Sequence, residues 1–184
     1  MVDAIRDNHT GTTCEKYTVC STTMVNLSGD SYVERLKLIP TDRQPDLIVV
    51  QMSTKDALWE EPIGSVSASF DAADFDDMTV AGAIETMIAY ARETFDCPIA
   101  FYSGTRYDSE PYAQMADLLP AIQEKWDICV INLFNDAEMT AIIGTELYHA
   151  YMADATHPTR RGYIEWWTPV FEQKLTEFFS RTKQ

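Results

Sequence analysis

An aspartate and a histidine three residues apart, Asp154 and His157, stand directly before a helical pattern that opens at Pro158. On a tight turn or a first helical turn, this spacing places both side chains on the same side of the backbone. A histidine that is oriented by a carboxylate can act as a general base. The same two residues also fit a capping aspartate beside a surface histidine. The spacing therefore predicts an acid–base pair and leaves its role open.

Short apolar runs of strand length alternate with helical patterns along the chain. The strand candidates are residues 17–20, 45–52, 98–103 and 127–134; the helical patterns cover residues 31–39, 79–95, 109–126, 136–142, 145–152 and 158–179. This alternation predicts an α/β fold with three layers, α/β/α, around a mainly parallel sheet. Sites in such folds lie beyond the carboxyl ends of the strands. We therefore expect the segments after residues 20 and 52, and the segment before residue 158, to form the site.

Length and composition indicate one domain over residues 1–184. Hydrophobic residues make up 46% of the 184-residue chain, which is enough for a sizeable core. Residues 57–78 are acidic and lack periodicity, so they are predicted to form a long loop near the site.

Three segments resemble conserved blocks of the SGNH hydrolases, the GDSL-like lipase and esterase family. They are "VCSTTMV" at 19–25, "PDLIVVQMSTKDA" at 45–57 and "DATHPTRRGYIEWW" at 154–167. The resemblance implies an SGNH/flavodoxin-like fold and the hydrolysis of acyl esters of small molecules or carbohydrates. It implies that His157 is the base and that Asp154 is its acidic partner. It also places Ser21 at the oxyanion glycine position and Lys55 at the oxyanion asparagine position, although a local ion pair between Lys55 and Asp56 is the alternative.

The family's nucleophilic serine lies in a G-D-S turn, and a literal Gly29-Asp30-Ser31 occurs here. Ser31 is too close to Lys55 to leave room for the helix, strand and helix that the family places between these blocks. We expect Ser31 to cap a helix, with Glu34 completing a capping box, and keep its role as nucleophile as the less favoured alternative.

The nucleophile block would then lie ahead of residue 17, so we expect the first strand to be missing and the domain to be incomplete at its N-terminus. Residues 17–20 would pair directly with residues 45–52 to close the gap. The resemblance thus favours an ester hydrolase that is inactive as the chain stands. The alternative is a non-catalytic binding or vestigial protein with the same fold, so the sequence leaves open whether the chain is an enzyme.

Charge and composition argue against several other classes of protein. The formal net charge is −15, which disfavours nucleic acid and anionic membranes as partners. The chain has no apolar run of about 18 residues, the length that spans a membrane. Neither the four cysteines nor the three histidines have the spacing of a metal site, so we expect no metal and no cofactor. The expected partner is a small-molecule ester and the expected location is cytoplasmic, while the oligomeric state stays open.

Overall fold

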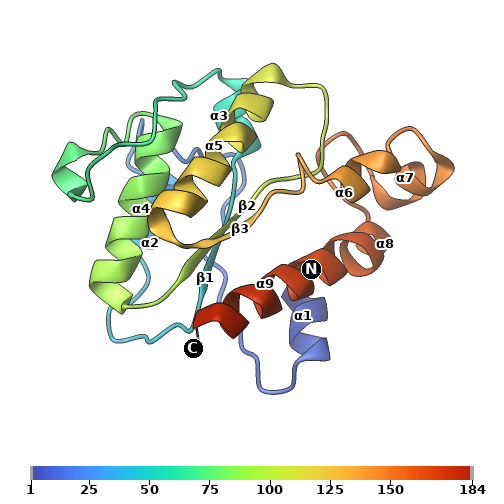
Figure 1. The fold of residues 1–184 in the computed structure, drawn as a ribbon, viewed down its shortest axis with the longest axis horizontal. Coiled ribbons are helices and arrows are strands. Elements are labelled where there is room, and N and C mark those ends of the chain that lie inside the picture. Colours follow the sequence, from blue (N-terminus) through green and yellow to red (C-terminus); the bar gives the residue numbers. More distant parts are fainter. Residues whose placement is uncertain (1, 183–184) are drawn as a thin grey trace. The chain divides into compact units, whose positions relative to one another are not determined.

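A computed structural model describes residues 2–182, and the chain divides into two compact units (Figure 1). The first, here called the sheet unit, comprises residues 17–103 and 108–132. The second, here called the terminal unit, comprises residues 1–16, 104–107 and 133–184.

The sheet unit contains a parallel sheet of three strands in the order β1-β2-β3. The strands are β1 (Ile48–Gln51), β2 (Ile99–Tyr102) and β3 (Cys129–Ile131). In the register of the sheet, Val50 stands opposite Phe101, which stands opposite Val130. The predicted α/β class with a parallel sheet is confirmed.

The helices of the sheet unit follow the predicted patterns, except the short helix over residues 54–58, which the sequence pattern did not predict. They are α2 (Tyr32–Leu36), α3 (Thr54–Leu58), α4 (Val80–Phe95) and α5 (Glu110–Trp126), with a 3₁₀ turn, η1 (Ala72–Asp74). The apolar stripe of α4 is buried, as its spacing predicts. The C-caps of α4 and α5 are Asp96 and Asp127; both aspartates adopt the left-handed conformation that terminates a helix before the next strand.

The strand predicted over residues 17–20 is wrong, and so is its pairing with residues 45–52. Residues 17–20 are irregular, and Val19 is 46% exposed. Ser21 then turns the backbone with a φ of 65°. The buried apolar side chains of this region are Met24 and Val25, both 0% exposed. The apolar side chains that this part of the chain buries therefore lie a few residues after the predicted strand.

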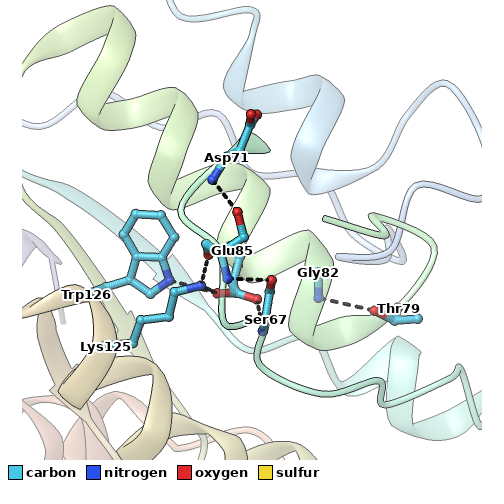
Figure 2. A network of polar contacts seen from close by, with 8 residues as sticks. Ser67, Asp71, Thr79, Gly82, Glu85, Lys125 and Trp126 are labelled. Carbon is cyan, nitrogen blue, oxygen red and sulfur yellow. Dashed lines mark hydrogen bonds and ion pairs between the residues drawn. The ribbon is translucent and has the colours of Figure 1, made fainter. Parts of the chain in front are cut away.

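The segment between α3 and α4 is fastened to the helices by the carboxylate of Glu85, which is 0% exposed (Figure 2). Glu85 accepts hydrogen bonds from the backbone N–H of Ser67 at 2.8 Å and from Trp126 Nε1 at 3.0 Å, and it forms an ion pair with Lys125. Lys125 Nζ also donates to the carbonyl of Ser69. These contacts stabilise the segment over residues 57–78. This segment is irregular except for the last residues of α3 and the turn η1.

The terminal unit is helical over the residues that the structure describes. Its helices are α1 (Val2–Asn8), α6 (Ala137–Ala141), α7 (Glu146–Tyr151), α8 (Arg160–Gly162), the π-helical turn η2 (Tyr163–Trp167) and α9 (Thr168–Thr182). The helical pattern predicted from Pro158 thus begins two residues later and is interrupted by a π turn. Within residues 2–182, no helix combines the length and apolar character needed to cross a membrane.

Candidate functional site

The loop that carries Asp154 and His157 is closed at its base by backbone contacts. Met152 and Pro158 form an antiparallel bridge, and the N–H of Ala153 donates to the carbonyl of His157 at 2.8 Å. Pro158 therefore lies in the bridge and does not begin the helix. Because the two ends of the loop are joined, its turn residues are confined to a small range of conformations.

Within this loop, the side chains of Asp154 and His157 are in direct contact. His157 Nδ1 lies 2.9 Å from both Asp154 Oδ1 and Asp154 Oδ2. The backbone N–H groups of Thr156 and His157 donate to Asp154 Oδ1 at 2.9 and 2.8 Å. The same carboxylate thus shapes the turn and orients the imidazole ring. Asp154 does not cap the following helix, because Thr159 is the N-cap of α8.

The electrostatics of the pair fix the state of the carboxyl group. The hydrogen bond from the Thr156 N–H, followed by the bond to the His157 side chain, lowers the pKa of Asp154 to about 2. Asp154 is therefore ionised near neutral pH and can only accept hydrogen bonds. A neutral His157 must then carry its proton on Nδ1, which leaves Nε2 as the proton acceptor. The His157 side chain is 73% exposed, so a group from outside the loop can approach the ring.

Thr159 and Gly162 anchor the loop to the end of α7. The N–H of Thr159 donates to the carbonyl of Tyr151 at 2.7 Å, and its hydroxyl accepts from the N–H of Gly162 at 3.0 Å. A Cβ atom on Gly162 would lie 2.1 Å from the Tyr151 carbonyl oxygen, so this approach requires glycine. The Tyr151 ring also stacks on Trp166 at 5.6 Å. Sequence reasoning missed these anchors, and the only signal was a glycine inside a helical pattern.

Ser21 and Lys55, the residues at the implied oxyanion positions, belong to the sheet unit. Ser21 adopts a left-handed conformation that favours glycine, with a φ of 65°. Lys55 lies on α3, directly after β1, and its Nζ is 5.6 Å from the centroid of the Trp59 ring. Among the described residues, Lys55 forms no ion pair with Asp56, because Asp56 accepts from the N–H groups of Met24 and Val25. The alternative of a local ion pair is therefore wrong.

Ser31 is the N-cap of α2, as predicted, but the Glu34 side chain does not complete a capping box and instead pairs with Lys37 at 2.7 Å. Its hydroxyl accepts from the N–H of Glu34 at 3.2 Å and donates to Asn26 Oδ1 at 2.9 Å. Ser31 is also 0% exposed. The Ser31 hydroxyl therefore both donates and accepts a hydrogen bond in contacts that stabilise the fold.

The candidate site residues thus fall into two groups. Asp154 and His157 form a contacting pair in the terminal unit, while Ser21, Ser31 and Lys55 lie in the sheet unit. No three or more histidine, cysteine or acidic side chains within the described residues are grouped so that they could hold a metal ion.

This arrangement of a parallel sheet and flanking helices defines the class of the fold as α/β, and solved structures narrow the class further. A Lactobacillus plantarum protein solved by a structural genomics consortium is 20% identical, with a TM-score of 0.66; the match covers 88% of this chain and 77% of that one. A Bacteroides ovatus protein assigned as a GDSL-like lipase is 16% identical, with a TM-score of 0.57, over 88% of this chain and 68% of that one. The chain therefore has an SGNH/GDSL-like fold. Its sequence matches no protein-family model and no curated protein.

Proposed function

We propose that this chain carries the acid–base half of an SGNH-type ester hydrolase that acts on acyl esters of small molecules or carbohydrates. The observation that carries the proposal is the contact of His157 Nδ1 with the ionised carboxylate of Asp154, which leaves Nε2 free in an exposed loop. The SGNH/GDSL-like fold of the chain supports the same reading. The expected substrate is a neutral ester, and no cofactor is required for this chemistry.

In this chemistry, a serine hydroxyl attacks the carbonyl carbon of the ester while His157 Nε2 takes the hydroxyl proton. The tetrahedral intermediate collapses to an acyl-enzyme, and His157 returns the proton to the departing alcohol. Asp154 keeps the imidazole in the required tautomer and stabilises the imidazolium that forms. The resemblance to the family implies that Ser21, through its backbone N–H, and Lys55 occupy the positions of the oxyanion donors.

We infer that residues 1–184 by themselves do not turn over esters. Ser31 is buried, and its hydroxyl is engaged by the N–H of Glu34 and by Asn26, so it is a poor nucleophile. A base and its acidic partner without a nucleophile leave only weak residual catalysis.

Hydrolysis of p-nitrophenyl acetate tests both parts of this proposal. The wild-type chain, His157→Ala and His149→Ala are compared, because His149 is an exposed histidine of the same unit and reports unspecific imidazole reactivity. We expect equal rates for the three proteins in plain buffer. With a small thiol added as an external nucleophile, we expect His157→Ala alone to be slower.

Two results would overturn parts of the proposal. A His157-dependent rate without added thiol, together with labelling by a serine-directed phosphonate, would show that the chain contains its own nucleophile. Equal rates for all three proteins with the thiol present would remove the role of His157 as a base.

The second candidate function is a non-catalytic binding protein with the same fold. The burial of Ser31 and the cationic Lys55 at a position where the family uses a neutral amide favour it. Binding of the ester probe without any His157-dependent release of p-nitrophenolate, even with the thiol added, would support this alternative.

A further inference from the structure

Asp56 is a buried carboxylate that takes no part in the proposed ester hydrolysis. It is 1% exposed and lies on α3, one residue after Lys55. Its Oδ2 accepts from the N–H of Met24 at 2.8 Å, and its Oδ1 accepts from the N–H of Val25 at 3.0 Å. Both carboxylate oxygens therefore hold the segment that follows Ser21.

Ser53, three residues earlier, joins the same two segments. Its hydroxyl donates to the carbonyl of Thr22 at 3.2 Å and accepts from the N–H groups of Lys55 and Asp56 at 3.0 and 3.3 Å. Its own N–H points to the sulfur of Met24 at 3.4 Å. Ser53 thus begins α3 and contacts the segment after Ser21 at the same time.

A carboxylate is an expensive group to bury in this place. Burial raises the pKa of Asp56, and the hydrogen bond from the Met24 N–H acts in the opposite direction. A buried charge without a cation is usually disfavoured, and an apolar residue would avoid that cost. What the carboxylate adds is two acceptors side by side, which neither an amide nor an apolar side chain provides.

We propose that Asp56 and Ser53 are positioning residues that fix residues 21–25 against the turn after β1. The same hydrogen-bond network thereby holds the backbone of Lys55 and the segment that follows Ser21. This positioning concerns the sheet unit alone. Only the role of the positioned groups as donors to an oxyanion rests on the proposed function.

Asp56→Asn tests this proposal with little change in volume. The asparagine oxygen can accept only one of the two N–H groups, while its NH₂ group faces the other donor. We expect backbone amide exchange in residues 21–26 to accelerate by about tenfold, as the loss of one charge-assisted hydrogen bond implies. The amide proton shifts of Met24 and Val25 should move upfield, because their bonds to a charged acceptor are lost. Exchange in β3 should stay unchanged.

Ser109→Ala is the matched control. Ser109 caps α5 in the same unit by accepting from the N–H of Tyr112 at 3.3 Å. This variant should loosen the start of α5 and leave residues 21–26 as they are. Ser53→Ala provides a second variant that keeps the carboxylate, and we expect a smaller acceleration confined to residues 21–26 and the start of α3.

Unchanged exchange in residues 21–26 of Asp56→Asn would overturn the proposal. A uniform acceleration over the whole sheet unit would overturn it too, because it would indicate a general loss of stability. If Asp56→Asn does not fold, Ser53→Ala decides by the same criterion. No ester is present in these measurements, so their outcome is independent of whether the chain belongs to a hydrolase.

Discussion

Asp154 and Asp56 both accept hydrogen bonds from two backbone N–H groups, but they do so in opposite settings. Asp154 has a side chain that is 58% exposed, and its partners Thr156 and His157 lie two and three residues away. Asp56 is 1% exposed, and its partners Met24 and Val25 lie 32 and 31 residues away. The exposed carboxylate organises its own loop and stays accessible, whereas the buried one joins distant segments of the chain.

The pKa values of the two carboxyl groups show what this difference means physically. The hydrogen bond from the Thr156 N–H lowers the pKa of Asp154 to about 2, since burial opposes it only weakly. Burial raises the pKa of Asp56 despite the similar bond from Met24. Two amide donors therefore do not fix the direction of a pKa shift; the degree of desolvation decides it.

The largest loss of stability is expected when the buried ion pair between Glu85 and Lys125 is broken. Glu85→Ala would leave the N–H groups of Ser67 and Trp126 without their acceptor and Lys125 without its anionic partner. We expect the free energy of unfolding to fall by about 3–5 kcal/mol, measured by urea denaturation. Glu177→Ala removes an exposed partner of Lys174 and should leave the midpoint close to wild type. Similar losses in the free energy of unfolding for both variants would contradict the expected difference between buried and exposed carboxylates.

A direct comparison of the two aspartates should give the next largest effect. Asp56→Ala leaves two buried amides without an acceptor, so we expect the free energy of unfolding to fall by about 2–3 kcal/mol. Asp154→Ala should shift the thermal midpoint much less, because water can replace the side chain at this exposed loop. Equal shifts in thermal unfolding would show that burial does not separate the two residues.

Ser31→Ala should have a smaller effect, because it removes a helix cap. We expect a loss of about 1 kcal/mol, close to that of the matched cap variant Ser109→Ala. Hydrolysis of p-nitrophenyl acetate should be the same for wild type and Ser31→Ala. A loss of hydrolysis with Ser31→Ala alone would restore Ser31 as a nucleophile.

The smallest effect is expected when the pH is lowered. Because the pKa of Asp154 is lowered to about 2 from its ordinary value of 3.8, the ionised form is favoured in the folded loop. The stabilising contribution is therefore complete above pH ~4 and is lost as the pH falls towards 2. The amide shifts of Thr156 and His157, followed by NMR, should change with a midpoint near pH 2. A midpoint at the ordinary value of 3.8 would contradict the hydrogen bonds within the loop.

The features predicted correctly from the sequence depend on short-range patterns. The apolar stripe of α4, the apolar runs of β1, β2 and β3, and the cap at Ser31 are all encoded within a few residues. The contact between Asp154 and His157 belongs to the same kind, because the turn that creates it is closed by the aspartate itself.

The features that sequence reasoning missed depend on partners far along the chain. Residues 17–20 have a strand-like pattern, but the burial in this region goes to Met24 and Val25 beside Asp56. Nothing in the neighbourhood of Asp56 indicates that its partners lie about thirty residues upstream. The sequence around Lys55 suggests only the adjacent aspartate as a partner, and that pairing does not form.

The tautomer of His157 is the most direct test of the acid–base pair. Nitrogen-15 NMR of the histidine side chains, at a pH where His157 is neutral, distinguishes a proton on Nδ1 from a proton on Nε2. The contact with ionised Asp154 predicts the Nδ1–H tautomer in the wild-type chain, and Asp154→Asn should shift it towards a mixture. A predominant Nε2–H tautomer in the wild type would contradict the pair, because the nitrogen proposed to accept the proton would already carry one.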